Sequence, residues 1–257
     1  MPPSAWPVLD QPGPLAFAHR GGAGDWPENT MPAFEAAVGL GYRYVETDVH
    51  VTSDGVLLAF HDDHLDRVTD RSGAISEQPW SAVREARVDG REPIPLLEDL
   101  LGTWPDLRVN IDPKHDGCLD ALIDVIRRTG SIHRVCVGSF SDRRLATLRG
   151  RLGTDLCTSL GPRGLARLRG ASYRLPAGSF AAGCAQVPRL VRGRVLVDER
   201  LVSTAHEQGL QVHVWTIDEP DAMTELLDLG VDGIMTDRPA VLRGVLEDRG
   251  EWPAPPA

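Results

Sequence analysis

The sequence has no excess of basic residues, no paired cysteines and no long apolar run. Its 27 Lys and Arg stand against 37 Asp and Glu, which argues against a general surface for nucleic acid or anionic membranes. The four cysteines lie far apart without a CxxC, so neither a zinc site nor a disulfide framework is indicated. No apolar run approaches the roughly 18 residues of a membrane span, and the first residues have no signal-peptide pattern. We therefore expect a cytoplasmic protein with free thiols and no nucleic-acid or stable membrane partner.

The chain also lacks a GxGxxG turn, while strand-like and helix-like segments alternate along it. Its 257 residues suit a single (β/α)8 barrel, which is typically about 250 residues long. Strands are predicted at 15–18, 44–51, 107–111, 134–137, 155–158, 182–187, 211–215 and 233–235, and a predicted helix follows each. This α/β alternation implies a parallel sheet, and about eight strands without the nucleotide-binding turn favour a closed TIM barrel over an open sheet.

We expect one domain, residues 1–257, with its barrel core at about 15–247. The alternation lapses at 62–92, where charged residues and turn formers outnumber apolar ones and only Trp80 and Val83 suggest a buried patch. We predict that this segment is an inserted cap. A helix opened by the prolines at 93 and 95 is expected to end at Gly102, and 248–257 is a Pro-rich tail without an assigned role.

Two carboxylates on one predicted strand give the clearest chemical signal. Glu46 and Asp48 are two residues apart, so both side chains leave the strand from one face. Such a pair repels unless a cation joins it, and a solvated pair is disfavoured because a barrel strand is buried on both faces. Asp112 and Lys114 repeat the spacing and offer a third carboxylate and a cation for a bound anion. Three carboxylates suit Ca²⁺ or Mg²⁺ better than zinc.

Further polar residues are predicted at the carboxyl ends of the strands. His19 and Arg20 follow the first strand, and a short hairpin delivers His61 beside the carboxylates. Trp215 and Asp237 lie on or after late strands. Because barrel active sites are built at the carboxyl ends of the strands, these side chains are expected to meet there, with phosphate as the natural anion.

Several of these residues also have plainer interpretations. Asp237 precedes a Pro and a helix, which favours an N-cap over a catalytic group. Glu28 is either a partner of Arg20 or a first-turn helix acid, and Trp215 either stacks on a substrate or belongs to the core. Asn29 or Thr30 caps the first helix. The remaining histidines are interpreted as structural or surface residues, with His64 and His115 as the foremost exceptions: His50, His64, His115, His133, His206 and His213.

These residues resemble those of the glycerophosphodiester phosphodiesterases, a family of TIM-barrel enzymes. The matching motifs occur in the family's order and span residues 15 to 240. They are His-Arg-Gly at 19–21, Pro-Glu-Asn-Thr at 27–30, Glu-x-Asp-Val at 46–49, Thr-x-Asp-Gly at 52–55, His-Asp at 61–62, Ile-Pro-x-Leu at 94–97, Val-Trp-Thr at 214–216 and Gly-Ile-x-Thr-Asp-Arg-Pro at 233–239.

The resemblance implies metal-dependent hydrolysis of glycerophosphodiesters to glycerol 3-phosphate and an alcohol. It implies a divalent metal on Glu46, Asp48 and a third carboxylate, with His19 and His61 as the catalytic histidines. The metal, Arg20 and Lys114 are expected to hold the phosphodiester. Where the family often carries Glu, this chain has the shorter Asp112, which leaves the metal's identity and affinity open. Also open are which histidine is the acid, and whether water or the glycerol 2-hydroxyl attacks.

Two alternatives stand beside this hypothesis. Lysophospholipase D or lyase-type barrels use the same arrangement of a metal and two histidines but act on lysolipids or sphingolipids. The segment 62–92 has no long apolar run for an acyl chain, so a soluble substrate is favoured. A barrel that only binds a phosphodiester is expected to lack a histidine or a carboxylate, and none is missing here. No coiled coil or partner-binding helix is apparent, so the oligomeric state is undetermined.

Overall fold

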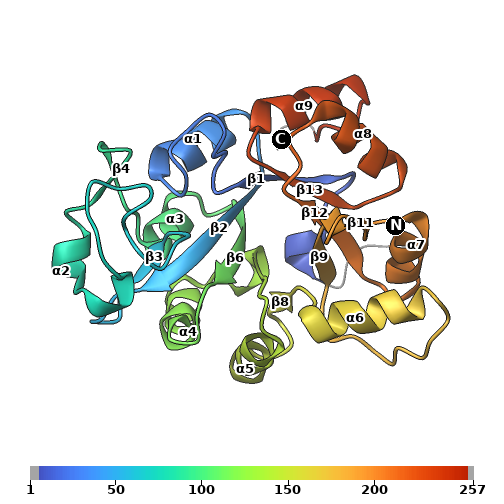
Figure 1. Ribbon diagram of the computed structural model, residues 1–257, viewed down its shortest axis with the longest axis horizontal. Coiled ribbons are helices and arrows are strands. Elements are labelled where there is room, and N and C mark those ends of the chain that lie inside the picture. The colour runs from blue at the N-terminus through green and yellow to red at the C-terminus, as the bar shows by residue number, and fades with distance from the viewer. Residues whose placement is uncertain (1–5, 254–257) are drawn as a thin grey trace.

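The computed structural model describes residues 6–253 and shows a parallel β-barrel surrounded by helices (Figure 1). The barrel strands are β1 Leu15–His19, β2 Tyr44–Val51, β6 Arg108–Pro113, β7 Val135–Val137, β8 Cys157–Thr158, β9 Cys184–Pro188, β12 Gln211–Trp215 and β13 Gly233–Thr236. They follow the order β8-β7-β6-β2-β1-β13-β12-β9, with parallel neighbours. One parallel bridge between Ser159 and Cys184 joins the two ends of this row. The predicted eight-stranded TIM barrel, nearly closed, is confirmed.

Helices connect the strands and cover the outside of the barrel (Figure 1). They are α1 Met31–Gly39, α3 Leu97–Thr103, α4 Cys118–Thr129, α5 Asp142–Leu152, α6 Pro162–Ala171, α7 Glu199–Glu207, α8 Pro220–Asp228 and α9 Pro239–Asp248. Thr30, Ser141 and Asp198 begin α1, α5 and α7 by accepting a hydrogen bond from the backbone N–H three residues later. Each bond satisfies a donor that the first helical turn leaves unpaired. Of the two candidates, Thr30 is therefore the cap of α1.

Both predicted ends of one helix differ from the structure. The segment before α3 is extended, because a residue that precedes a proline avoids the helical region and Ile94 precedes Pro95. The helix therefore starts later than expected, at Leu97, and it continues through Gly102 to Thr103.

The alternation of β2 places polar and apolar side chains on opposite faces. All eight residues of β2 are buried. Glu46 and Asp48 face the cavity inside the barrel, whereas Val45 and Val49 pack in the main core between strands and helices. The short 3-10 turn η1, Pro7–Leu9, contributes Val8 and Leu9 to the apolar cluster that fills the barrel interior. A polar cavity thus lies above a packed apolar floor.

The segment after β2 forms a small substructure at one side of the barrel. Strand β3, Leu57–Ala59, returns antiparallel to β2, and the elements η2 Ile75–Glu77, α2 Trp80–Val83, β4 Arg87–Val88 and β5 Glu92–Pro93 follow. Figure 1 shows α2 and β4 at the edge of the molecule. This part has its own apolar cluster, larger than the predicted Trp80 and Val83 patch: Leu58, Phe60, Leu65, Ile75, Val83, Ala86, Val88 and Ile94.

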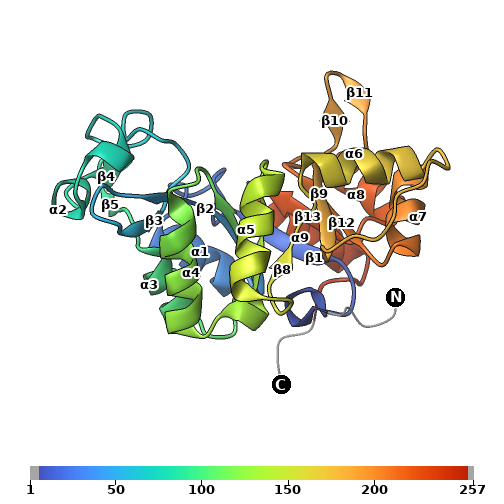
Figure 2. The same ribbon diagram turned by 90° about the horizontal axis from the view of Figure 1, so that it is seen from below.

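A second excursion lies between β9 and α7. Strands β10, Leu190–Val191, and β11, Arg194–Val195, form an antiparallel hairpin. In Figure 2 it projects from the barrel above α6. The turn η3, Ile132–Arg134, precedes β7.

The chain end after α9 folds back on the barrel as far as the structure describes it. Trp252 packs edge-on against Tyr42, with ring centroids 5.1 Å apart. Residues 254–257 of the predicted tail lie outside the described residues. Within residues 6–253, no helix has the length and apolar character needed to span a membrane.

Candidate active site

The three predicted metal ligands meet at the carboxyl ends of β2 and β6. Asp112 pairs in register with Asp48 on the neighbouring strand, and Glu46 lies one pleat earlier on the same face. All three line one cavity of about 590 Å³. Glu46 and Asp48 are only 5% and 2% exposed. The strand register therefore brings these carboxylates together.

Two cations lie against the carboxylates. Lys114 Nζ is 2.6 Å from Asp48 Oδ1 and 2.9 Å from Asp112 Oδ2. Arg20 Nε is 3.2 Å from Asp48 Oδ2, and the backbone N–H of Arg20 donates to Glu46 Oε2 at 3.3 Å. Both cations line the cavity, so an anion bound beside the carboxylates would meet them.

The carboxylates differ in how well their charge is balanced. Burial and the neighbouring Asp48 raise the pKa of Glu46 to about 8. Burial also raises the pKa of Asp48, but Lys114 and Arg20 outweigh it and lower that pKa below its usual value. Burial raises the pKa of Asp112. Glu46 is therefore the carboxylate that most needs further positive charge.

The chemistry of this donor set fits a hard divalent cation. Carboxylate oxygens are preferred ligands of Ca²⁺ and Mg²⁺, and a cation would supply the charge that Glu46 lacks. As the side chains stand in residues 6–253, no three His, Cys, Asp or Glu side chains are grouped so that they could hold an ion. The Lys114 ammonium instead holds Asp48 and Asp112.

His19 is paired with a carboxylate that sequence reasoning assigned elsewhere. His19 Nδ1 lies 2.6 Å from Asp237 Oδ1, and Nε2 lies 3.8 Å from Glu46 Oε2. Burial lowers the pKa of His19, but Glu46 and Asp237 outweigh burial and raise it above its usual value. The prediction that Asp237 caps α9 is wrong: the residue before α9 is Arg238, and no side chain caps that helix. Asp237, which follows β13, holds the His19 ring instead.

His61 follows β3 and lines the same cavity. His61 Nδ1 lies 2.6 Å from Asp62 Oδ1, and Arg67 Nε lies 2.5 Å from Asp62 Oδ2. The hydrogen bond from Arg67, with a further one from His61, lowers the pKa of Asp62 to about 2. Asp62 is therefore ionised at neutral pH and favours a proton on His61 Nδ1, which leaves Nε2 for proton transfer.

Glu28 connects Arg20 to the inserted segment. Glu28 Oε1 accepts from Arg20 Nη1 at 3.1 Å and from Arg67 Nη2 at 2.6 Å. Of the two interpretations of Glu28, the structure supports the one in which it is a partner of Arg20. Sequence reasoning missed Arg67, because it lies in a segment without periodicity or a recognisable motif.

Asn29 is another residue that sequence reasoning missed. Its Nδ2 donates to Asp48 Oδ2 at 3.3 Å, and its Oδ1 accepts from Thr47 Oγ1 at 2.8 Å. Asn29 is 1% exposed and has a φ of 54°, a left-handed conformation that asparagine tolerates better than most residues. It therefore fixes Asp48 from the loop after β1. The available signal was the Pro-Glu-Asn-Thr motif, whose asparagine was considered only as a helix cap.

One part of the cavity is apolar. Trp215, at the end of β12, lines the cavity and also packs against the inner core, so both of its interpretations hold in part. Phe140, which is 70% exposed, packs edge-on against it with ring centroids 5.8 Å apart. The other large apolar lining residues come chiefly from α6 and the β10–β11 hairpin with their adjoining loops: Leu160, Pro162, Leu165, Val191 and Leu196.

Comparison with known proteins identifies the family. The model of the glycerophosphoryl diester phosphodiesterase family matches residues 19–241. The chain belongs to this family. It is an enzyme, a phosphoric diester hydrolase, and the family predicted from the sequence motifs is confirmed.

Relatives of this phosphodiesterase cover nearly its whole length. It is 42% identical over 249 residues to Probable glycerophosphodiester phosphodiesterase 2 of Mycobacterium tuberculosis, with 93% of each chain covered. It is 26% identical to the human protein named Lysophospholipase D GDPD1, covering 90% of this chain and 86% of that one. A crystal structure from Silicibacter pomeroyi, assigned as a glycerophosphoryl diester phosphodiesterase, superposes with a TM-score of 0.79 at 26% identity, covering 95% and 97% of the chains.

The other histidines of the phosphodiesterase occupy varied positions. His213 is fully buried, and burial lowers its pKa to about 3. His64 contacts Asp63 at the surface. His115 packs 5.3 Å from the His50 ring, and both line a smaller cavity of about 530 Å³ beside His61. Of the two histidines singled out as exceptions, only His115 therefore lies near the candidate site.

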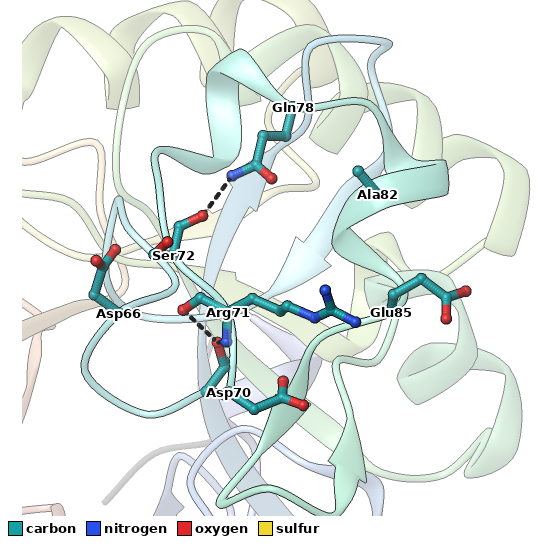
Figure 3. Close-up of a pocket in the computed structure, with 8 residues that line it drawn as sticks. Asp66, Asp70, Arg71, Ser72, Gln78, Ala82 and Glu85 are labelled. Atoms are coloured by element: carbon teal, nitrogen blue, oxygen red, sulfur yellow. Dashed lines mark hydrogen bonds between the residues drawn. The ribbon is translucent and has the colours of Figure 1, made fainter.

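Another cavity, of about 660 Å³, is drawn in Figure 3. It is formed within the inserted segment by Asp66, Thr69, Asp70, Arg71, Ser72, Gln78, Ala82 and Glu85. Figure 3 shows the Gln78 amide bonded to Ser72 across it. No histidine and no residue of a barrel strand lines this cavity, so we place the phosphodiesterase chemistry in the cavity at the strand ends.

Proposed function

We propose that this phosphodiesterase hydrolyses glycerophosphodiesters to glycerol 3-phosphate and an alcohol. The observation that carries the proposal is one cavity lined by two imidazoles and by three carboxylates that have two cations against them. Each imidazole, His19 and His61, is held through Nδ1 by a carboxylate of its own. The name of the Mycobacterium tuberculosis relative supports the same substrate class.

Glu46, Asp48 and Asp112 are the residues that would hold a divalent metal, Ca²⁺ or Mg²⁺. When bound, the metal would polarise a phosphoryl oxygen and offset the charge that grows during the reaction. Arg20 and Lys114 bind the remaining phosphoryl oxygens, and preorganised cations of this kind stabilise developing charge most where water is excluded. Glu28 holds the Arg20 guanidinium in this position.

The two histidines divide the proton transfers between them. One of His19 and His61 removes the proton of the attacking oxygen, and the other protonates the leaving alcohol, a division that suits imidazole near neutral pH. Asp237 and Asp62 orient the rings through Nδ1. The attacking oxygen belongs to water or to the glycerol 2-hydroxyl. Phosphorus NMR distinguishes these routes, because only attack by the hydroxyl produces a cyclic phosphate.

The test is release of glycerol 3-phosphate from glycerophosphocholine and glycerophosphoethanolamine. We expect release with Mg²⁺ or Ca²⁺, none with EDTA, and a loss of about 100-fold or more in His19→Ala and in His61→Ala. His64→Ala, at the surface, is the matched control and should keep full activity. Release that persists in both His19→Ala and His61→Ala would refute the two-histidine mechanism.

A lysophospholipid is the second candidate substrate. Sequence reasoning disfavoured it because the inserted segment has no long apolar run, but the apolar wall of the cavity comes from other elements, namely Phe140, α6 and the hairpin. This wall suits an acyl chain beside the phosphodiester. The human relative carries the name of that activity. Choline release from lysophosphatidylcholine, measured beside release from glycerophosphocholine, ranks the two substrates.

A further inference from the structure

Exposed apolar side chains lie at the mouth of the cavity and on the β10–β11 hairpin beside it. This apolar rim consists of Phe140, Leu190, Val191 and Val195, whose exposed fractions are 70%, 49%, 45% and 59%. Phe140 and Val191 also line the cavity. Leu190 pairs with Val195 across the β10–β11 hairpin, so these two side chains share one face, whereas Val191 and Arg194 lie on the opposite face. Adjacent exposed apolar side chains on a soluble protein commonly mark a contact surface.

The hairpin stands clear of the barrel. Figure 2 shows β10 and β11 projecting from the molecule above α6. Residues 190–195 are all exposed. A flat surface that approaches the molecule from this side would therefore meet the hairpin early.

The segment that carries the hairpin has an unusual charge. Residues 156–197 contain seven arginines and no Lys, Asp or Glu, in a chain whose net charge is −10. Arg192 and Arg194 lie on the hairpin itself, and among residues 6–253 neither has an ion pair or a side-chain hydrogen bond. Arg189, at the base of the hairpin, is paired with Glu225. The hairpin thus carries an exposed apolar pair on one face and two unpaired positive charges, at its turn and on its other face.

We infer that the apolar rim and the hairpin arginines dock on an anionic phospholipid surface. Apolar side chains enter the boundary between headgroups and acyl chains, and arginines beside them remain with the anionic headgroups. The negative charge of the whole chain does not oppose this docking, because the segment itself is positive. Salt screens charges that lie more than about 10 Å from the lipid surface.

Only the consequence of this docking for hydrolysis rests on the proposed function. Because Val191 of the same hairpin lines the cavity, docking of the hairpin would bring the cavity mouth close to the lipid surface, where phosphodiesters that carry an acyl chain are found. The binding itself is measurable without any hydrolysis.

The test is sedimentation of the full-length protein with vesicles of phosphatidylcholine, with or without phosphatidylglycerol. We expect binding only when phosphatidylglycerol is present. The double variant R192Q/R194Q should bind about 25-fold more weakly, since each arginine near an anionic surface contributes roughly fivefold. The matched control R84Q/R91Q removes the same charge from exposed arginines of the inserted segment and should bind like the wild type. L190S/V195S should lose about tenfold or more, because it removes the apolar contact and keeps the charge.

Three results would overturn the inference. The first is no binding to either kind of vesicle, and the second is an equal loss of binding in R84Q/R91Q. The third is full binding by L190S/V195S, which would indicate that the protein is attracted to the anionic surface by charge alone. Thermal unfolding of each variant checks that it is folded. Hydrolysis of soluble glycerophosphocholine should be unchanged in L190S/V195S and R192Q/R194Q. If neither the wild type nor any variant hydrolyses glycerophosphocholine, the proposed function fails. The vesicle results still decide whether the protein docks on lipid.

Discussion

Asp237 offers the sharpest single test of how the site is built. In the structure its carboxylate holds His19 Nδ1 at 2.6 Å, whereas the sequence pattern assigned it to the N-terminus of α9. The substitution Asp237→Asn separates these roles. Asparagine is as good an N-cap as aspartate, so a capping role predicts no change. An orienting role predicts a loss, because the amide removes the charge that stabilises a protonated imidazole.

The expected size of the effect follows from the contact. A hydrogen bond to a charged group contributes about 1.5–3 kcal/mol. The Asp237 side chain is 30% exposed, which places this bond near the lower end. A loss of about 1.5–2 kcal/mol of transition-state stabilisation corresponds to a decrease of about 10- to 30-fold in kcat/KM.

The assay is release of glycerol 3-phosphate from glycerophosphocholine, with the thermal midpoint measured on the same preparations. We expect Asp237→Asn to lose activity at an unchanged thermal midpoint, and His19→Ala combined with Asp237→Asn to be no worse than His19→Ala alone. Wild-type activity in Asp237→Asn would refute the orienting role. Additive losses in the double variant would show that Asp237 acts independently of His19.

Three further predictions concern the metal, the pH dependence of stability and the loop after β1. Asp112→Asn should weaken activation by Mg²⁺ at least about tenfold in a titration of EDTA-treated enzyme, because it removes a proposed ligand. Asp112→Glu should stay metal-dependent, and equal activation of Asp112→Asn and wild type would contradict the proposed ligand role. Burial depresses the pKa of His213 to about 3, so the unfolded chain binds a proton below pH 6.5 that the folded chain does not. The free energy of unfolding should therefore fall by about 1.6 kcal/mol between about pH 6.5 and 5, and urea unfolding of His213→Gln should show a smaller fall over the same interval. Asn29→Ala should cost about 2–3 kcal/mol in urea unfolding, because it loses the bond to Asp48 and strains a left-handed backbone position; a loss below about 0.5 kcal/mol would contradict that account.

The fold was predictable because its signals are periodic. The two-residue period of β2 places Glu46 and Asp48 on one face, and parallel register then brings Asp112 beside Asp48. Both relations follow from strand geometry alone. The helix before Gly102 was placed less well, because Pro95 keeps Ile94 extended and delays the start of α3.

The site was predictable where a residue type has one common use at its position, and less so where it has two. An aspartate between a strand and a helix is commonly a cap, and only the three-dimensional position of His19 shows the other use of Asp237. Asn29 was ambiguous for the same reason. Arg67 lies in a segment without periodicity, so its bonds to Glu28 and Asp62 depend on how the insertion folds over the barrel.

The most direct test of the central claim is phosphorus NMR of glycerophosphocholine incubated with the enzyme, in the presence of Mg²⁺ or Ca²⁺ and again with EDTA. The proposed function predicts that the diester resonance is replaced by that of glycerol 3-phosphate when metal is present, and that it persists with EDTA or in His19→Ala. A diester that remains intact with either metal would contradict the assignment of glycerophosphodiesters as substrates.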